Sequence, residues 1–496
     1  MMVYIAASLR SFTDRVPRIE LSAKSVREAL DVLTDRYPEA VKGFFDETGD
    51  LRHFISIYVN DRDIRSLKGI ATKLSDGDEL WLIPAIAGGA QKEGEEAPAK
   101  KPAGGSVISA ERMKAVTIEE KQIERYSNHL QLKEISIKGQ KRIMAGKVLI
   151  AGLGALGGVV AERLAAAGVG TIGLADFDEV KLPNLQTQTI HSTRDIDRPK
   201  ASAARDRLKK LNPYVSSVLH QEKLTGDNIE EVVEAYDLVV DATDNFVSRY
   251  LVNDACVLHG IPEVFGAMYQ FEGFVTVFAP GGPCYRCLYP APPPVGIVPT
   301  CAAAGVMNAL PAIIGGLMAT EVLKLLSGSG EVLIGRAITL DAWNLQYHAV
   351  QTVKDSGCAV CSVHPVISTA MDIDYEDFCG LKENPEEEPI ATIEPEELAR
   401  RIAEEEPITI IDVREPHERA IRKFPGTIAI PIGQLARRQN ELDPDTDTVF
   451  VCREGKRSIL AIRTLREAGY EGPMFSLKGG LEAAAQIIFP NEGAWL

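Results

Sequence analysis

Cysteine is scarce in this sequence, with eight residues among 496. A long chain with so few cysteines is not organised by a disulfide framework, and its cysteines are better candidates for metal binding or catalysis. Positive charge is also in deficit, because 54 Lys and Arg face 70 Asp and Glu and leave a net charge of −16. This balance argues against direct nucleic-acid binding, which needs a basic face.

Long hydrophobic runs are almost absent. The first residues lack a basic segment followed by an apolar core, so no secretory signal is predicted and a cytoplasmic location is expected. One run, "CAAAGVMNALPAIIGGLMAT" (301–320), is nearly long enough to span a bilayer, but it contains Asn308 and Pro311. Because no second such run exists, we predict a buried helix and no membrane partner.

Composition shifts divide the chain into an α/β multidomain protein. Residues 88–105 and "LKENPEEEP" (381–389) are poor in apolar side chains, which is typical of linkers. The length suits three domains of about 150 residues each. The predicted organisation is a first domain at 1–89, a flexible linker at 90–115, a second domain at 116–365, a linker at 366–391 and a third domain at 392–496.

The first domain ends in Gly88-Gly89. Strands are predicted at 3–9, 18–23, 53–60 and from residue 79 onward, and a helix begun by Ser25 is predicted between the second and third. This order, with "LRHFISIYVNDRDIR" and "PAIAGG", resembles the β-grasp, ubiquitin-like sulfur carriers of the molybdopterin-synthase small-subunit and ThiS type. The resemblance implies that the diglycine is adenylated and converted to a thiocarboxylate. A plain linker is the alternative, and the position after a terminal strand favours the carrier.

The second domain carries a nucleotide fingerprint. "GKVLIAGLGALGGVVAERLAAAGVGTIGLADFD" (146–178) predicts a strand, a glycine-rich turn, a helix and a strand, the start of a Rossmann-like doubly wound domain. Gly152, Gly154 and Gly157 fit the tight turn, the approach to phosphate and close helix packing. Asp176 follows the next strand, where it can bind a ribose hydroxyl. NAD enzymes share this pattern, so an NAD oxidoreductase is one alternative.

Downstream motifs distinguish these possibilities. "LPNLQTQTIH" (182–191), "RPK" (198–200) and "DATDN" (241–245) resemble the ThiF/MoeB superfamily over about residues 117–361. The resemblance implies an adenylyltransferase that uses ATP and Mg²⁺ and forms a homodimer. It assigns the nucleotide to Asp176, Asn184, Gln186, Lys200, Asp244 and Asn245, with Asp244 also holding magnesium and acting in catalysis.

Two positions depart from the superfamily pattern. Asn128 and Thr187 stand where the family usually has arginines that touch the ATP phosphates, and Arg198 could stand in for one of them. Each lost charged hydrogen bond costs about 1.5–3 kcal/mol of stabilisation. The second alternative is therefore a degenerate scaffold that binds nucleotide weakly and presents the other two domains.

Five of the six cysteines of the second domain fall into two groups, and the sixth, Cys256, is expected to pack inside a helix. Two CxxC pairs, Cys284 with Cys287 and Cys358 with Cys361, have the spacing of a closed structural Zn²⁺ site, although one CxxC alone could be redox-active. Cys301 opens the long apolar run, and a helix N-terminus lowers the pKa of a thiol. The family resemblance makes Cys301 the cysteine that links covalently to the carrier, and simple packing is its alternative.

The third domain centres on Cys452. "PITIIDVRE" and "TVFVCREGKRSILAIRTLREAGY" resemble the rhodanese family over about residues 392–489, which implies an α/β domain that carries a persulfide on Cys452. The loop from Arg453 through Glu454, Gly455 and Lys456 to Arg457 is expected to direct backbone N–H groups at the sulfur. Asp412 and Arg414 are expected to brace it. A phosphatase loop is the alternative, and the loop length with "LKGG" (477–480) favours rhodanese.

Together these resemblances imply an adenylyltransferase and sulfurtransferase that makes a carrier thiocarboxylate for molybdopterin, cysteine or thionucleoside synthesis. Its expected partners are a sulfur-carrier protein, either its own first domain or a separate one, and a sulfur donor such as a cysteine desulfurase. Gly89 is joined to Ala90 by an amide, which cannot be adenylated. The diglycine is therefore either vestigial or released by a processing protease.

Overall fold

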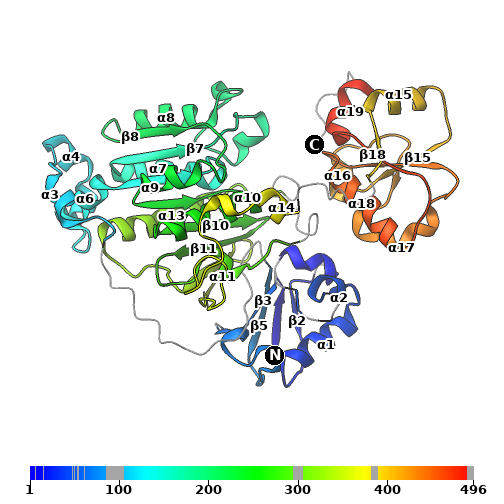
Figure 1. Ribbon diagram of the computed structural model, residues 1–496, viewed down its shortest axis with the longest axis horizontal. Helices are drawn as coiled ribbons and strands as arrows, with labels where there is room; N and C mark the ends of the chain where they lie inside the picture. Colours follow the sequence, from blue (N-terminus) through cyan, green and yellow to red (C-terminus); the bar gives the residue numbers. More distant parts are fainter. Residues whose placement is uncertain are drawn as a thin grey trace. The chain divides into compact units, whose positions relative to one another are not determined.

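The computed structural model describes residues 1–5, 7–14, 16–46, 49, 51–52, 55–60, 62–84, 106–293, 305–380 and 389–488. The chain divides into two compact units, one of residues 1–293 with 298–379 and one of residues 294–297 with 380–496. Three sheets are present in the described residues, two in the first unit and one in the second (Figure 1). The predicted α/β multidomain fold is confirmed.

The N-terminal sheet has the mixed order β2-β1-β5-β3-β4. Its strands are β1 (Met2–Ile5), β2 (Arg18–Glu20), β3 (Ile55–Val59), β4 (Arg62–Asp63) and β5 (Glu79–Pro84). β1 and β5 pair in parallel at its centre, which is the β-grasp arrangement predicted. Helix α1 (Val26–Arg36) begins as expected, since the Ser25 hydroxyl accepts a hydrogen bond from the Glu28 amide at 3.2 Å. The strand predicted at 3–9 is shorter, because a 3₁₀ helix (Ala7–Phe12) follows β1.

The central sheet has the order β13-β12-β11-β10-β9-β6-β7-β8. Five neighbouring strands are parallel: β6 (Lys147–Ala151), β7 (Thr171–Ala175), β8 (Ser216–His220), β9 (Leu238–Asp241) and β10 (Glu263–Tyr269). Three antiparallel strands extend it: β11 (Glu272–Phe278), β12 (Arg336–Asp341) and β13 (Gln346–Gln351). Helix α7 (Ala155–Ala167) packs with α8 (Lys200–Leu211), and α10 (Phe246–Leu258) packs with α9 (Ile229–Glu234). The predicted Rossmann-like order is therefore present.

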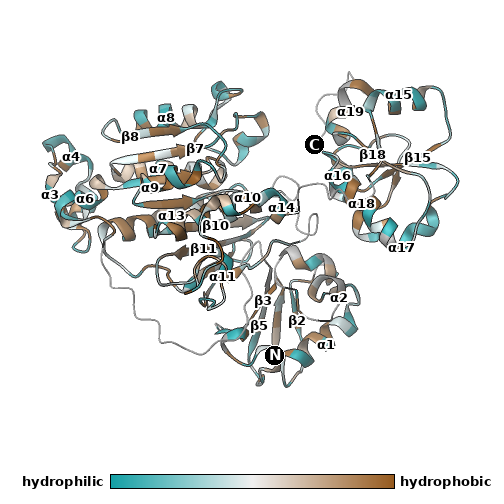
Figure 2. Ribbon diagram, in the orientation of Figure 1, coloured by the Kyte–Doolittle hydropathy of each residue, from teal (hydrophilic) through white to brown (hydrophobic). Residues whose placement is uncertain are grey.

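The long apolar helix begins later than predicted. We expected it to open at Cys301, but α13 spans Leu310–Ser327, with Pro311 in its first turn. Gly305, with a φ of 75°, and the residues up to Ala309 precede it without helical structure. By length and composition alone α13 could cross a membrane, but the buried core helix of a globular domain often has the same length and composition. It packs on α7, β10 and β11, so the predicted buried helix is confirmed (Figure 2).

The two predicted linkers are partly folded. Residues 106–115 were expected to be flexible, but the Val107 amide donates to the Leu325 carbonyl at 3.1 Å, Ile108 is buried, and α3 (Ala110–Ala115) follows. In the second segment Ile367 is buried and α14 (Tyr375–Phe378) packs on α10. The cause is the same in both: isolated apolar residues in a polar stretch find a hydrophobic neighbour.

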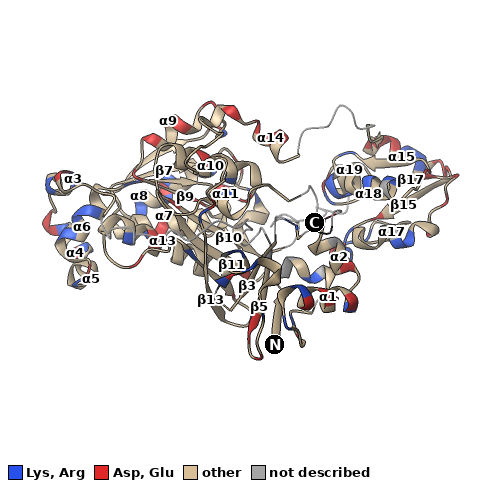
Figure 3. Cartoon of the chain, turned by 60° about the horizontal axis from the view of Figure 1, so that its bottom comes forward, with Lys and Arg blue, Asp and Glu red and all other residues tan. Residues whose placement is uncertain are grey.

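Charged helices surround this core. Lys and Arg appear on α3, α4 (Glu120–Arg125) and α6 (Ser136–Ala145), and acidic residues appear on α9 and α14 (Figure 3). A further short helix, α5 (Ser127–Gln131), joins α4 to α6. α3 and α4 also carry acidic residues, so both signs of charge are mixed on the helices of the first unit.

The second unit is a parallel sheet of order β14-β18-β17-β15-β16. Its strands are β14 (Thr392–Ile393), β15 (Ile408–Asp412), β16 (Ile428–Ala429), β17 (Asp447–Val451) and β18 (Met474–Leu477). Its helices are α15 (Pro395–Ala403), α16 (Pro416–Ile421), α17 (Leu435–Arg438), α18 (Lys456–Glu467) and α19 (Gly480–Ile488). Successive residues of β17 enter different cores, Val449 one and Phe450 the other. A parallel sheet is expected to be buried on both faces in this way.

Candidate functional site

The glycine-rich turn after β6 is packed too closely for side chains. Gly152 has a φ of 88°, and a Cβ placed there would lie 2.8 Å from the Ala242 carbonyl oxygen. A Cβ on Gly157, inside α7, would lie 1.8 Å from the Gly152 carbonyl oxygen. Gly154 is the N-cap of α7. The turn therefore brings an uncovered backbone to the start of a helix, which is the arrangement that binds phosphate.

Asp176 is fixed beside this turn. Its Oδ2 accepts a hydrogen bond from the Leu153 amide at 2.8 Å, and its Oδ1 accepts one from the Asp178 amide at 2.9 Å. Burial raises the pKa of Asp176, and the charge of Lys200 acts in the opposite direction. Since β6, β7 and β9 are neighbours, the residues after them meet at one carboxyl edge of the sheet, where ligands of such folds bind.

Lys200 lies at the same edge. It begins α8 with 7% of its surface exposed, and its Nζ lies 2.9 Å from Asp178 Oδ2. Asn184 belongs to a 3₁₀ helix (Leu182–Gln186) and its Oδ1 accepts the Lys181 amide at 2.9 Å. Gln186, at the end of that helix, is exposed. Lys200 is the buried cation of this group. Asp178 links Lys200 to Asp176, because its carboxylate accepts from Lys200 and its amide donates to Asp176.

Asp244 follows β9 and is exposed. Asn245 caps α10, because its Oδ1 accepts the Ser248 amide at 2.9 Å, and its Nδ2 lies 3.4 Å from Asp244 Oδ1. Asp241 supports both residues from below, and this support was not predicted from the sequence. Asp241 is fully buried, and its Oδ1 accepts both the amide and the hydroxyl of Thr243, at 2.9 and 2.7 Å. The first aspartate of "DATDN" was the available signal for this brace.

Arg198, the candidate replacement for one of the missing arginines, is paired with carboxylates. The Arg198 guanidinium is held by Asp195 at 2.7 Å and by Asp206 at 2.6 Å. Asn128 is exposed on α5, and Thr187 ends the 3₁₀ helix that carries Asn184. Arg198 is thus engaged with two carboxylates, and its role toward a phosphate stays a prediction.

Within the first unit, the N-terminal sheet contacts the antiparallel end of the central sheet. The rings of Tyr4 and Trp81 stack at 3.9 Å, and the Trp81 ring lies 3.8 Å from the ring of His348 on β13. Arg10 Nη2 lies 3.0 Å from Glu272 Oε1. A cavity of about 230 Å³ lies among these residues.

Gly88 and Gly89, the predicted carrier terminus, lie outside the described residues.

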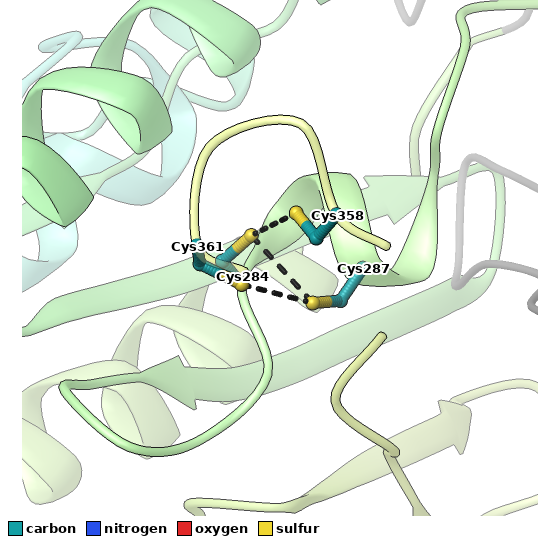
Figure 4. A group of neighbouring side chains, drawn as sticks. All are labelled: Cys284, Cys287, Cys358 and Cys361. Atoms are coloured by element: carbon teal, nitrogen blue, oxygen red, sulfur yellow. Dashed lines mark hydrogen bonds between the residues drawn. The ribbon is translucent and has the colours of Figure 1, made fainter. Parts of the chain in front are cut away.

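The four predicted zinc ligands form one cluster (Figure 4). The Sγ atoms of Cys284 and Cys287 lie 3.8 Å apart, those of Cys284 and Cys358 3.6 Å, and those of Cys287 and Cys361 3.3 Å. Zn–S bonds of about 2.3 Å in a tetrahedron require S–S separations of about 3.8 Å. The cluster fits a zinc site, and its ligands come from the start of α11 (Tyr285–Leu288) and from one loop.

The other cysteines of the first unit have different surroundings. Cys256 is buried on α10 and Cys379 is buried after α14, and burial raises the pKa of both thiols. These are packing cysteines. Cys301 lies outside the described residues, and it does not stand at the start of α13, which begins at Leu310.

Cys452 follows β17 at the entrance to α18. Its side chain is buried, and its Sγ receives the Gly455 amide at 3.2 Å and lies 3.7 Å from the Ser458 hydroxyl. Gly455 has a φ of 89°, which turns its N–H toward the sulfur. The expected loop that stabilises a sulfur anion therefore has at least this one backbone donor in place.

Two flanking features shape that loop. A Cβ on Gly480 would lie 2.4 Å from the Arg453 carbonyl oxygen, so the diglycine of "LKGG" is needed for the loop to pack. Asp412 and Arg414 are fully buried and form a two-point ion pair at 3.0 and 2.8 Å. β15, which ends in Asp412, is the strand next to β17. The expected brace thus stands one strand from Cys452.

Comparison with known proteins gives a match for each part of the chain. The ThiS family matches residues 3–89, the ThiF family residues 126–360 and the rhodanese-like domain residues 394–486. The three predicted resemblances are confirmed, in the order predicted.

Several curated proteins are similar over most of their length. The probable adenylyltransferase/sulfurtransferase MoeZ of Mycobacterium tuberculosis is 39% identical over 386 residues, which cover 76% of this chain and 96% of that protein. The sulfur carrier protein adenylyltransferase of Thermus thermophilus is 45% identical over 267 residues, which cover 53% of this chain and 98% of that protein. Adenylyltransferase and sulfurtransferase MOCS3 of Drosophila virilis is 36% identical, with 75% and 86% covered. Among solved structures, MccB of E. coli has a TM-score of 0.44 at 22% identity, with 52% and 76% covered.

Proposed function

Because this chain belongs to the adenylyltransferase/sulfurtransferase family that joins a ThiF domain to a rhodanese-like domain, we propose that it activates a sulfur carrier with ATP and then transfers sulfur to it. The observation that carries the proposal is the presence of two matched sites in one chain. The glycine turn, Asp176, Lys200 and Asp244 share one sheet edge, and Cys452 occupies a loop built to stabilise a sulfur anion.

The first step is adenylation. The carboxylate of a carrier's terminal glycine attacks the α-phosphorus of ATP, the α–β phosphoanhydride bond breaks, and pyrophosphate leaves. Asp176 would hold the ribose. The phosphates would be bound by the Gly152–Gly157 turn, Asn184 and Lys200. Gln186 and Asn245 would contact the nucleotide at the edge of this site. Such a step depends on neutralising phosphate charge more than on a strong base.

Two metal ions have candidate ligands. Asp244 is exposed at the sheet edge, where its carboxylate would hold Mg²⁺ bound with ATP and so neutralise phosphate charge. Cys284, Cys287, Cys358 and Cys361 would hold Zn²⁺, whose role is to fasten the end of the domain. The zinc cluster belongs to the fold and not to the reaction.

The second step is sulfur transfer. The persulfide of Cys452 attacks the acyl-adenylate and displaces AMP, which leaves an acyl disulfide between the carrier and Cys452. The Cys301 thiolate then attacks the Cys452 sulfur, so that the carrier departs as a thiocarboxylate and a Cys301–Cys452 disulfide forms for a cellular thiol to reduce. In this scheme Cys301 acts as the resolving residue.

The carrier, donor and setting complete the proposal. The carrier is either the chain's own first 89 residues, released after Gly89 by a protease, or a separate protein. A cysteine desulfurase would supply the persulfide, and the enzyme would act as a cytoplasmic homodimer. The thiocarboxylate would feed molybdopterin, cysteine or thionucleoside synthesis. The proposed carrier, adenylyltransferase and rhodanese domains span residues 1–89, 116–365 and 392–496.

One observation favours the scaffold alternative. Asn128 and Thr187 supply no cations, and Arg198 is occupied by Asp195 and Asp206. The test is ATP–pyrophosphate exchange with a separately made carrier that consists of residues 1–89, followed by mass spectrometry of that carrier after a sulfur donor is added. Exchange together with a sulfur-for-oxygen mass increase supports the proposed function. Persulfide formation on Cys452 without any exchange supports the scaffold.

A further inference from the structure

Every cation of the Cys452 loop is paired with a carboxylate. Three ion pairs do this: Arg453 Nε with Glu482 Oε1 at 2.6 Å, Lys456 Nζ with Glu454 Oε2 at 3.4 Å, and Arg457 Nη1 and Nη2 with Glu418 Oε2 and Oε1 at 2.7 and 2.6 Å. The loop therefore has cationic residues in its sequence but much less positive charge in its structure.

The pair of Arg457 and Glu418 is the most constrained of the three. It is a two-point pair, with the side chains 21% and 12% exposed, whereas Glu482 and Glu454 are 41% and 42% exposed. Glu418 Oε2 also accepts the Glu415 amide at 2.9 Å, in the capping box that starts α16. Both partners are thus fixed, and a partly buried two-point pair is shielded from solvent far more than an exposed one.

Arg457 is also close in sequence to the residues that contact the Cys452 sulfur. It is the second residue of α18 and lies two positions after Gly455, whose amide contacts the Cys452 sulfur. It directly precedes Ser458, whose hydroxyl lies 3.7 Å from that sulfur. A guanidinium in this place would attract an anionic sulfur donor if no carboxylate neutralised it.

We propose that Glu418 is a donor-specificity residue, which neutralises Arg457 and so excludes doubly charged sulfur donors from Cys452. The site then favours donors with a single negative charge at the transferred sulfur, the charge of a cysteine persulfide. This inference rests on the proposed sulfurtransferase function of Cys452.

Two small donors isolate the effect of charge. With thiosulfate, a dianion, the Cys452 thiolate attacks the outer sulfur, the S–S bond breaks, and sulfite leaves with the electron pair. With methanethiosulfonate, a monoanion, the same bond forms and breaks, and methanesulfinate leaves. In both cases cyanide then removes the outer sulfur as thiocyanate and regenerates the thiolate, so no further oxidant or reductant is needed.

The experiment measures thiocyanate formation by the full chain with each donor and takes the ratio of the two kcat/KM values, thiosulfate over methanethiosulfonate. We expect Glu418→Gln to raise this ratio about tenfold at low salt, with a smaller rise at high salt, because one charge near a dianion is removed. Gln retains an oxygen to accept the Glu415 amide, so α16 keeps its cap. Glu441→Gln is the matched control, since Glu441 pairs with Arg438 at 2.6 Å elsewhere in the same unit. It should leave the ratio unchanged.

The double variant Glu418→Gln/Arg457→Gln tests whether Glu418 acts through Arg457. The ratio should return to the parental value or fall below it, because the released cation is gone. An unchanged ratio in Glu418→Gln, or a rise that persists in the double variant, would overturn the proposal. Absence of thiocyanate from both donors in the parent would instead overturn the sulfurtransferase function itself.

Discussion

The Arg286 guanidinium and the Asp254 carboxylate form a two-point ion pair that is almost completely buried. The Nε–Oδ1 and Nη2–Oδ2 distances are both 2.7 Å, and the side chains are 3% and 0% exposed. Arg286 lies between two cysteines of the cluster, on α11, and Asp254 lies on α10. Tyr375 on α14 donates its hydroxyl to Asp254 Oδ2 at 2.9 Å. The pair therefore fastens three helices around the proposed zinc site.

Removing Asp254 should be strongly destabilising. Asp254→Ala leaves Arg286 charged, buried and without this carboxylate, and breaking a buried pair costs about 3–5 kcal/mol of unfolding free energy. Denaturant titration measures the loss. Asp206→Ala is the control, because Asp206 pairs with Arg198 at 39% exposure and an exposed pair contributes about 1 kcal/mol or less. Equal losses in the two variants would contradict this account.

The cysteine cluster should bind close to one zinc per chain. Cys284→Ser/Cys358→Ser removes one ligand from each CxxC pair, so we expect metal analysis to find no bound zinc and thermal unfolding to begin at a lower temperature. Cys379→Ser is the matched control, since Cys379 is buried outside the cluster. Zinc retained by the double variant would refute the ligand set.

Sequence reasoning succeeded where the chemistry is local. The turn at Gly152, the cap at Ser25 and the CxxC pairs each occupy a few consecutive residues, so their geometry follows from short-range rules. It failed where packing decides. Ile108 and Ile367 each lie in a polar stretch, and no neighbouring residue indicates that either side chain is buried. The residue at which α13 begins depends on the tertiary contacts of its first turn.

The pairing of Glu418 with Arg457 was also beyond the sequence. The two residues are 39 positions apart, and the fold alone brings α16 to the first turn of α18. Nothing in the sequence around Arg457 indicates that this loop cation has a carboxylate partner. Long-range electrostatics of this kind needs the three-dimensional arrangement.

Restoring a phosphate-binding cation should raise adenylation. Thr187→Arg adds a guanidinium beside Asn184, and one charged hydrogen bond is worth about 1.5–3 kcal/mol, or about ten- to a hundredfold in rate. Carrier-dependent pyrophosphate exchange measures the change. Ser216→Arg, on the exposed edge strand β8, adds the same charge elsewhere and should have no effect. No exchange in the parent or in Thr187→Arg would favour the scaffold.

Glu263 should make the first unit less stable as the pH rises. It is 1% exposed on β10, and neither carboxylate oxygen has a hydrogen-bond partner among the described residues. Burial, followed by the charges of Asp241 and Asp254, raises its pKa well above the ordinary 4.5. The folded state therefore holds a proton that the unfolded chain releases. Its contribution to stability is complete below pH 4.5 and is lost as the pH rises through the raised value.

Substitution tests this sign. In the wild type the unfolding free energy should fall by up to about 1.4 kcal/mol per pH unit above pH 5, and Glu263→Gln should remove that part of the slope. Guanidinium titrations at pH 5, 6 and 7 provide the comparison. Glu331→Gln is the control, because Glu331 is 83% exposed. The same pH dependence in wild type and Glu263→Gln would show that Glu263 is not the group responsible.

Release of the carrier should occur after Gly89. The Gly89–Ala90 amide has neither the charge nor the nucleophilicity to attack ATP, so adenylation of this chain's own diglycine requires a cut at that bond. The following residues, "AQKEGEEAPAKKP", are polar and lack β-branched side chains, which is typical of segments that proteases reach. We expect intact-mass spectrometry of protein from its native host to find a fragment of residues 1–89, with a portion heavier by one sulfur-for-oxygen exchange.

Gly89→Leu should remain full length, because a side chain at the cleaved bond obstructs a narrow protease site, whereas Gly94→Leu in the same segment should be cut normally. Only full-length chain under sulfur-demanding growth would mean that the N-terminal domain stays attached and serves as a fixed binding domain.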